Sequence, residues 1–240
     1  MILLKIIEEG GNHMIMNSKQ DVSVIIRARN EERWIGHCIQ SILEWLTSPE
    51  IIVVDNNSND KTLEIVKRFK HDPELNEHRN FAPIKIVKID EYSPGASINL
   101  GVKYATNGFI LVISSHCVLK QFDLEKHKKS LLKFDAIFGK QTPVWDGKKI
   151  AKRYIWSHFG DDIVENMYSD MERRYFFHNA LSFFKKDILE KEPFDEHLVG
   201  KEDRYWAEKI ISKDHNFLYD PSMEVDHHYT DNGNTWKGIG

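Results

Sequence analysis

Two adjacent acidic residues, Glu202 and Asp203, follow Gly200-Lys201 and begin a stretch with the apolar spacing of a helix. Acidic residues in the first turn of a helix often do no more than complement the helix dipole. A carboxylate at the mouth of a helix can also act as a general base that takes a proton from an attacking hydroxyl group. Asp203 is therefore a candidate general base, with dipole compensation as the alternative.

A second group of acidic and amide residues, DNNSND, runs from Asp55 to Asp60 directly after a short apolar run. If that run is a parallel strand, Asp55 lies at its carboxyl end, where open α/β sheets bind ligands. A carboxylate at this place can accept the imide N–H of uracil or thymine. Asp55 is therefore a candidate for base recognition, whereas Asp60 is equally well explained as the cap of the following helix.

Two arginines, Arg27 and Arg29, alternate at the end of the apolar run 22–28 and are followed by Asn30 and Glu31. Cations on an otherwise apolar strand need anionic partners or a wet cleft. These residues consequently suggest a cleft that binds an anionic ligand. The structural alternative is an ion pair with Glu31 or Asp55.

Histidines occur at the ends of two further apolar runs. Ser114, Ser115 and His116 follow one of them, and His227 with His228 follows another near the C-terminus. Imidazoles from two distant segments can share a divalent ion with phosphate oxygens and water. The alternative is a hydrogen-bonded structural role, which is common for a single histidine at a strand end.

The elements that must position these residues alternate between short β-branched runs and longer amphipathic stretches. This alternation predicts βα units on a mostly parallel sheet, with ligands bound at the carboxyl ends of the strands. Strands are expected at residues 22–28, 51–55, 84–89 and 109–114, and helices at residues 30–46, 60–70 and 96–105.

The second half of the chain is less regular. The acidic segment 161–170 predicts a mixed sheet or a mobile loop, and residues 200–214 have the apolar spacing of a helix. A short strand is expected within residues 217–225, ending at Asp220-Pro221 because proline donates no ladder hydrogen bond. With no internal repeat or flexible linker in sight, we predict one domain over residues 21–230, flanked by tails at residues 1–20 and 231–240.

Composition excludes several functional classes. A net charge of -4 and a pI near 6.3 argue against nucleic acid as a partner. No apolar run approaches the roughly 20 residues that span a bilayer, and the N-terminus lacks the features of a signal peptide. Cys38 and Cys117 form neither a disulfide framework nor a Cys-rich zinc site. We expect a protein of the reducing cytoplasm.

Several blocks of the sequence follow one another in a set order: VSVIIRARNEE, IIVVDNNSNDKT, SPGASINLGVKYATNGFILVISSHCV, HNALSFFKKDIL, GKEDRYWAEKI and YDPSMEVDHH. Taken in this order, they resemble inverting family 2 glycosyltransferases of the GT-A fold, a Rossmann-like α/β fold with a mostly parallel central sheet flanked by helices. The resemblance covers residues 21–228 and implies that a smaller mixed C-terminal part binds the acceptor.

The resemblance implies roles for individual residues. Asp203 corresponds to the base that activates the acceptor, and Glu202 to a residue that positions sugar hydroxyls. Asp55 corresponds to the aspartate that contacts the nucleotide base. The remaining residues implied to bind the nucleotide sugar are Arg27, Arg29, Asn30, Glu31, Asn99, Ser114, Ser115 and Asn179.

One departure from the family pattern concerns the metal. Where most members have Asp-x-Asp, this chain has Ser114-Ser115-His116, which is similar to a rhamnosyltransferase-like branch with Ser-x-His. His116 and His227 would then hold a divalent ion, Mn²⁺ in preference to Mg²⁺, because nitrogen ligands suit the softer ion. Metal-independent catalysis is the alternative, with Arg27, Lys201 or Arg204 stabilising the diphosphate.

The function implied by the resemblance is transfer of a hexosyl or deoxyhexosyl group, with inversion, from a nucleoside-diphosphate sugar to a glycan or lipid-linked glycan. The expected setting is bacterial capsule or O-antigen synthesis at the cytoplasmic face of the inner membrane, with peripheral attachment as one option. One alternative is a catalytically silent sugar-nucleotide-binding protein. The other is a sugar nucleotidyltransferase, disfavoured because VIIRARNEE lacks the glycines of a phosphate loop.

Overall fold

The computed structural model describes residues 21–70, 82–145, 148–149, 154–231 and 233. The predicted tail at residues 1–20 lies outside this part of the chain, as does most of the predicted tail at residues 231–240. Among the residues described, no helix has both the length and the apolarity needed to cross a bilayer.

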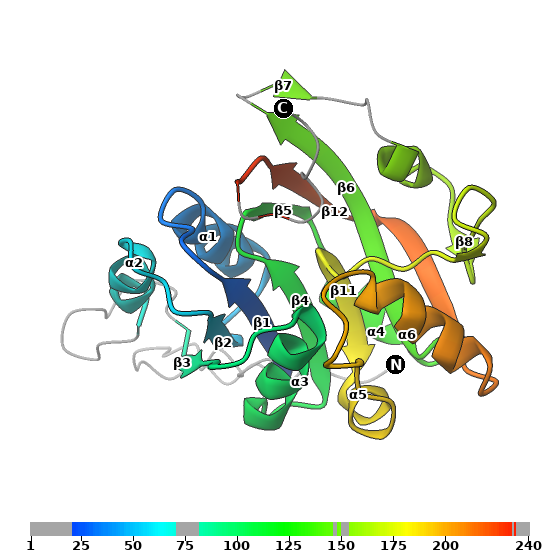
Figure 1. The fold of residues 1–240 in the computed structure, drawn as a ribbon, viewed down its shortest axis with the longest axis horizontal. Helices are drawn as coiled ribbons and strands as arrows, with labels where there is room; N and C mark the ends of the chain where they lie inside the picture. Colours follow the sequence, from blue (N-terminus) through cyan, green and yellow to red (C-terminus); the bar gives the residue numbers. More distant parts are fainter. Residues whose placement is uncertain (1–20, 71–81, 146–147, 150–153, 232, 234–240) are drawn as a thin grey trace, which may run out of the picture.

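The N-terminal half builds a parallel sheet. Its strands lie in the order β3-β2-β1-β4 (Figure 1). Most of their β-branched side chains are buried, on both faces of the sheet. Each of the strands predicted here is confirmed. The observed bounds are β1 Val22–Ala28, β2 Glu50–Asp55, β3 Ile84–Lys88 and β4 Phe109–Ser114.

Helices cover both faces of this sheet. Helices α1 (Ile35–Trp45) and α2 (Thr62–Arg68) bury their apolar sides against one face, together with Val24 and Ile26. Helix α3 (Pro94–Tyr104) packs on the opposite face, against Ile25. Alternate residues of β1 therefore serve two separate cores, as the pleat of a strand requires.

Helix α1 begins later than the sequence predicts. Asn30 has a left-handed backbone with φ of 51°, and its side-chain oxygen accepts the N–H of Asn59 2.8 Å away. Residues 29–34 therefore form a loop that is tied to the turn after β2. The prediction that the helix starts at Asn30 is wrong because this amide bonds to a distant segment instead of capping the helix.

The C-terminal half continues the same sheet with mixed strand directions. Strand β11 (Leu181–Lys185) pairs antiparallel with β4, and the order continues through β6 (Ala136–Trp145), β12 (Phe217–His228) and β5 (Cys117–Gln121). Short strands β7 (Lys148–Lys149) and β8 (Val164–Glu165) pair with β6 and β12. The predicted α/β architecture with a mixed C-terminal part is confirmed.

The remaining elements lie around this part of the sheet. The segment 161–170 contributes to small strands, as one of the two sequence interpretations expects; β9 and β10 form a separate two-stranded sheet. The other bounds are α4 Leu124–Ser130, the 3-10 helix η1 Tyr154–His158, β9 Tyr168–Ser169, β10 Arg174–Tyr175, α5 Lys186–Lys191 and α6 Glu202–Ile211.

Strand β12 does not end at Asp220-Pro221, contrary to the sequence prediction. Its pairing with β6 shifts register between Asp220 and Glu224 and then resumes up to His228. The bulge accommodates Pro221, which has no N–H to donate to the ladder. Because the strand continues past the proline, it carries His227 to the same end of the sheet as the tip of β4.

Candidate active site

A cavity of about 510 Å³ lies at the carboxyl ends of β1 and β4 and is lined by residues from both halves of the chain. Strand order reverses at β1, since β2 lies on one side of it and β4 on the other. Open α/β sheets bind ligands at such a switch point. The predicted residues that line the cavity are Arg27, Arg29, Glu31, Ser114, Ser115, His116, Asn179, Lys201, Glu202, Asp203 and Arg204.

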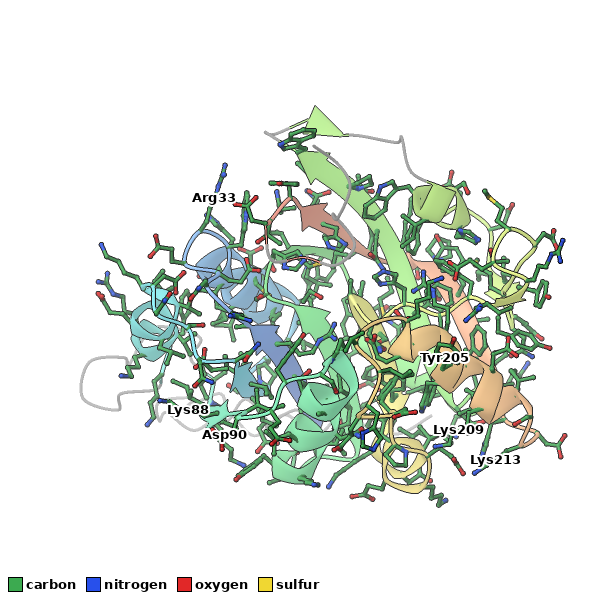
Figure 2. The ribbon with its side chains drawn as sticks, in the orientation of Figure 1. Arg33, Lys88, Asp90, Tyr205, Lys209 and Lys213 are labelled. Carbon is green, nitrogen blue, oxygen red and sulfur yellow. The ribbon has the colours of Figure 1, made fainter. Side chains whose placement is uncertain are left out.

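Helix α6 brings the acidic pair to this cavity. The indole of Trp206 is buried and donates to the carbonyl of Glu192 2.6 Å away, just beyond α5. Lys209 and Lys213, labelled in Figure 2, both reach the carboxylate of Glu192, at 3.0 and 2.6 Å. These contacts hold α6 against the end of α5 and so fix where its N-terminus meets the cavity.

Asp203 is buried and its two oxygens are both engaged. Oδ1 accepts the N–H of Arg204 at 2.9 Å, while Oδ2 accepts Nη1 of Arg204 at 2.8 Å and the N–H of Asn179 at 3.4 Å. Burial opposes ionisation of this carboxyl, but the adjacent Arg204 guanidinium outweighs burial and holds the pKa of Asp203 below its ordinary value. Asp203 is therefore ionised at neutral pH.

The pKa of Glu202 shifts in the opposite direction, although Glu202 is adjacent to Asp203 in the sequence. Burial and the charge of Asp203 raise the pKa of Glu202 to about 7. Its cationic neighbour is Arg27, whose Nη1 lies 3.6 Å from Oε1 of Glu202. The pair of Glu202 and Asp203 therefore gains or loses a proton near neutral pH. Shifted pKa values of this kind are typical of catalytic sites.

Arg27 links the two halves of the site. Its Nη2 donates to the carbonyl of Asn179 at 3.2 Å and to Oγ of Ser114 at 3.4 Å. Arg27 and Ser114 are register partners on β1 and β4, so their side chains meet at the cavity floor. The structure therefore places a guanidinium directly beside the serine at the first position of the Ser114-Ser115-His116 segment.

Arg204 is oriented toward acidic side chains. Besides Asp203, its guanidinium meets Glu172, with 3.5 Å between Nη2 and Oε1, and Nη1 donates to the carbonyl of Phe177 at 3.0 Å. Lys201, by contrast, is exposed, has a left-handed backbone with φ of 59°, and places Nζ 3.8 Å from Oε2 of Glu172. Of the two predicted diphosphate ligands, Lys201 is thus the more accessible.

His116, in the turn after β4, and His227, on β12, lie next to each other. Their Nε2 atoms are 3.0 Å apart. Nδ1 of His116 contacts Oε1 of Glu31 at 3.2 Å, and Nδ1 of His227 contacts Oε1 of Gln141 at 2.9 Å. An oxygen thus lies against Nδ1 of each ring, while the two Nε2 atoms face one another.

This arrangement suits a divalent cation. Burial and the neighbouring His116 hold the pKa of His227 well below its ordinary value, so that ring is neutral. Ligating histidines usually donate their other N–H to an oxygen, and the oxygens of Glu31 and Gln141 lie at that place here. Among the residues described, no group of three or more His, Cys, Asp or Glu side chains could hold a metal.

His178 is a cavity residue that the sequence analysis missed. Its Nδ1 accepts the N–H of Ala180 at 3.1 Å, which leaves the hydrogen on Nε2. Burial and the nearby Arg204 lower the pKa of His178 to about 3. The ring is therefore a neutral hydrogen-bond donor. Its position next to Asn179, in a block already singled out, was the available sequence signal.

Glu172 was also missed. It lines the cavity from the turn between β9 and β10, just after the segment 161–170, for which the sequence predicted a mixed sheet or a mobile loop. An acidic residue in an irregular, charge-rich segment gives no sequence signal that separates it from its solvent-exposed neighbours.

Several predicted residues lie outside the cavity lining. Asp55 is buried at the tip of β2, where its carboxylate accepts the N–H of Ser58 at 3.2 Å, and Asn30 bonds to the same turn. Asn99 lies farther away. Its amide donates to the carbonyl of Phe194 and to Glu196, both at 2.9 Å, and accepts the N–H of Phe194, so it joins α3 to the loop after α5.

Comparison with known proteins gives a family match. The model of the family described as "Glycosyl transferase family 2" matches residues 23–192. A dolichyl N-acetyl-alpha-D-glucosaminyl phosphate 3-beta-D-2,3-diacetamido-2,3-dideoxy-beta-D-glucuronosyltransferase of Methanococcus voltae is 30% identical over 42% of this chain. A poly(ribitol-phosphate) beta-glucosyltransferase of Bacillus spizizenii is 26% identical over 86% of it. The chain spans only 30% and 33% of the lengths of these two relatives.

Solved structures show the same fold. The S. aureus TarS fragment 1–349 in complex with UDP-GlcNAc superposes with a TM-score of 0.67 at 19% identity, over 90% of this chain and 61% of that one. A mannosyltransferase from Pyrobaculum calidifontis, in complex with GDP-Man and Mn²⁺, superposes with a TM-score of 0.63 at 20% identity, over 90% and 59%. These likenesses confirm the predicted GT-A fold.

Proposed function

Because this chain belongs to glycosyltransferase family 2, we propose that it transfers a hexosyl or deoxyhexosyl group, with inversion, from a nucleoside-diphosphate sugar to a hydroxyl of a glycan. The observation that carries the proposal is the cavity at the switch point of the sheet. There the ionised Asp203 faces the same space as Arg27 and Ser114 from the strand tips. Proton acceptor and anion-binding groups are thus within one site.

Asp203 serves as the general base in this proposal. The acceptor hydroxyl loses its proton to the carboxylate while its oxygen forms a bond to the anomeric carbon. The bond from that carbon to the diphosphate oxygen breaks with both electrons, and the nucleoside diphosphate leaves from the opposite face. Glu202 positions hydroxyl groups of the sugars, and the neutral His178 donates a hydrogen bond in the same cavity.

The leaving diphosphate needs positive charge, which the chain offers at two places. Arg27 lies beside Ser114 on the cavity floor, and Lys201 is accessible at the mouth. His116 and His227 would hold a divalent cation, Mn²⁺ or Mg²⁺, whose charge would stabilise the diphosphate. A structural relative with bound Mn²⁺ supports this part of the proposal, and metal-independent stabilisation by the cationic side chains is its alternative.

The donor base is proposed to be uracil or thymine. Asp55 ends β2 next to β1, and it accepts only the N–H of Ser58 among the hydrogen bonds described for its carboxylate. An ionised carboxylate has further acceptor capacity for the N3–H of these bases. The UDP-GlcNAc complex of a structural relative is consistent with this choice. Arg29, Asn30, Glu31, Ser115 and Asn179 complete the proposed nucleotide-sugar site, whereas the amide of Asn99 is engaged by Phe194 and Glu196.

The acceptor is proposed to be a glycan or lipid-linked glycan of a bacterial surface polysaccharide, such as capsule or O-antigen. Relatives named for poly(ribitol-phosphate) and dolichyl phosphate acceptors support a polymeric or lipid-linked acceptor. The Ser114-Ser115-His116 segment supports a place in the rhamnosyltransferase-like branch. We propose a cytoplasmic site of action, with peripheral contact to the inner membrane.

A thermal-shift and turnover screen tests the donor. UDP-, dTDP-, GDP- and CMP-sugars are compared, and a ligand at 100 times its Kd should add about 2.7 kcal/mol of stability. We expect UDP- or dTDP-sugars to stabilise the protein. We also expect transfer to glycan acceptors, with an inverted anomeric centre seen by NMR.

Three other outcomes would contradict parts of this proposal. Tighter binding of GDP or CMP contradicts the role of Asp55. Binding without turnover on any acceptor favours a silent sugar-nucleotide-binding protein, and formation of a nucleotide sugar from sugar phosphate and nucleoside triphosphate favours a nucleotidyltransferase.

Calorimetry with UDP tests the cation. We expect the nucleotide to bind more tightly with Mn²⁺ than with chelator, and Mn²⁺ to bind more tightly with UDP, because the coupling between two ligands is reciprocal. His227→Ala should abolish this coupling. Equal affinities and equal turnover with and without the ion would make the enzyme metal-independent.

A further inference from the structure

The buried guanidinium of Arg204 lies between two carboxylates. One is Asp203, 2.8 Å from Nη1, and the other is Glu172, 3.5 Å from Nη2. The exposed fractions of the three side chains are 6%, 7% and 5% for Arg204, Asp203 and Glu172. Arg204 also lies over the ring of Phe176, with 4.2 Å between Cζ and the centroid. The guanidinium is thus fixed on two edges by charge and on one face by an aromatic ring.

Glu172 reaches this place from a different part of the chain. It lies in the turn between β9 and β10, and β10 is attached to α6 because the N–H of Tyr175 donates to Oε1 of Glu208 at 2.6 Å. Arg174 adds a contact to Tyr205, with 5.1 Å between its Cζ and the ring centroid; Figure 2 labels Tyr205 on α6. The turn is therefore held in a defined place relative to the helix that carries Asp203.

On the basis of the proposed function, we propose that Glu172 is a positioning residue. It anchors the Arg204 guanidinium and, through it, orients the Asp203 carboxylate toward the acceptor hydroxyl. With Glu172 present, Arg204 is attracted from both sides. Without that charge, Asp203 would be the anion in direct contact with the buried guanidinium. The guanidinium would then bind Asp203 more strongly and compete with the incoming proton.

Glu172 also affects how readily Asp203 accepts a proton. Removing its negative charge from the site disfavours protonation of the carboxylates that remain, so the acid limb of the pH–rate profile should move to lower pH. Other ionisable groups share this environment and stay unchanged in the test. They are Glu202 and Arg204 on α6, Lys201 before it, Arg27 on β1, Arg29 and Glu31 after it, His116 after β4, and His178 before β11.

Glu172→Gln tests the proposal, with Glu172→Asp as the conservative variant. We expect Glu172→Gln to lower kcat by roughly 10- to 100-fold with the donor KM unchanged. Its acid limb should move down by about half a pH unit to one unit. Glu172→Asp, which keeps the charge on a shorter side chain, should show a smaller loss of kcat and a smaller shift. Glu165→Gln, an exposed change in the nearby β8, is the matched control and should behave like wild type.

Melting temperature and UDP binding are measured for every variant. A folded Glu172→Gln variant with wild-type kcat, or with a lowered kcat but an unmoved acid limb, overturns the proposal. If that variant does not fold, Glu172→Asp decides, and wild-type kcat in that variant overturns the proposal. A wild-type protein that binds no nucleotide sugar and transfers none overturns the proposed function instead, so the two failures are distinguishable.

Discussion

Glu202 and Asp203 are neighbours in sequence and equally buried, yet their pKa values move in opposite directions. The difference comes from their partners. Arg204 contacts Asp203 at 2.8 Å, whereas Arg27 lies 3.6 Å from Glu202. Burial disfavours charge on both carboxyls, and only the closer, hydrogen-bonded cation overcomes it for its partner. At the residue scale, the site thus separates an ionised acceptor from a carboxyl that is partly protonated at neutral pH.

Asp203→Asn should lower kcat by roughly 10²-fold or more, because an amide cannot take the proton of the acceptor hydroxyl. Binding of the donor should survive, because an amide has nearly the same shape as the carboxylate and its one oxygen can still accept the N–H of either Arg204 or Asn179. Steady-state kinetics and UDP calorimetry measure the two effects separately. Near-normal turnover of this variant would remove Asp203 from the role of base.

Glu202→Gln should stabilise the protein at high pH. The pKa of Glu202 is about 7 in the folded protein and 4.5 in its reference state, so the folded state holds a proton that the unfolded state releases. The bound proton stabilises the folded state below about pH 4.5, and this contribution is lost as the pH rises through about 7. A neutral glutamine avoids the loss, which corresponds to roughly 3 kcal/mol at most.

Urea unfolding at pH 5 and pH 8 measures this effect as the difference between Glu202→Gln and wild type. The difference should favour the variant more at pH 8 than at pH 5. Glu44→Gln, an exposed change on α1, serves as the control and should show no such dependence. A difference that is the same at both pH values would mean that Glu202 ionises normally in the folded protein.

At the scale of elements, the bulge in β12 decides which residues reach the site. Pairing with β6 is interrupted after Asp220 and resumes at Glu224, opposite Lys140. Gly139 lies at this interruption, and a Cβ built on it would be 2.3 Å from the carbonyl oxygen of Met223 and 2.6 Å from Cδ2 of Leu181. The close approach of the two backbones therefore requires glycine at position 139.

Gly139→Ala should destabilise the fold by about 1–3 kcal/mol, because the added methyl group forces backbone or core side chains to move. Displacement of β12 should also weaken any binding of Mn²⁺ that depends on His227. Urea unfolding measures the first effect and calorimetry the second. Gly108→Ala is the control, since its Cβ would meet nothing within 4 Å. Equal stability of the two variants would contradict the close packing at the bulge.

At the scale of the whole molecule, one sheet runs through both halves of the chain. Strand β4 of the parallel half pairs directly with β11 of the mixed half, and the cavity takes residues from both. The two apolar clusters also cross between the halves. One contains Val24 and Val225, and the other contains Ile25 and Phe217. Separation of the halves would therefore expose both cores.

We accordingly expect the chain to unfold as one cooperative unit. Far-ultraviolet circular dichroism and tryptophan fluorescence should give coincident transitions, and the calorimetric and van't Hoff enthalpies should agree. A saturating nucleotide sugar should shift the whole transition upward without splitting it, since its site spans both halves. Two resolved transitions would contradict the single domain predicted for residues 21–230.

The sequence by itself determined the parallel half of the fold and the residue types at its strand ends. Apolar runs such as 22–28 and 109–114 are local patterns, and parallel strands must bring their carboxyl ends to one edge. The prediction that Arg27 and His116 lie at one edge of the sheet followed from this. Asp203 was assigned to the same site by the resemblance to family 2 glycosyltransferases, because no strand pattern places the helix that carries it.

Other features depend on contacts that no local pattern encodes, and only the tertiary structure decided them. The bulge that lets β12 pass Pro221 needs the bare backbone of Gly139 on a strand distant in sequence. The anchoring of Arg204 by Glu172 needs a turn whose own segment has no clear periodicity. Hydrogen bonds and ion pairs of this kind are set by distances across the folded molecule, whereas periodicity reports only which side of an element is buried.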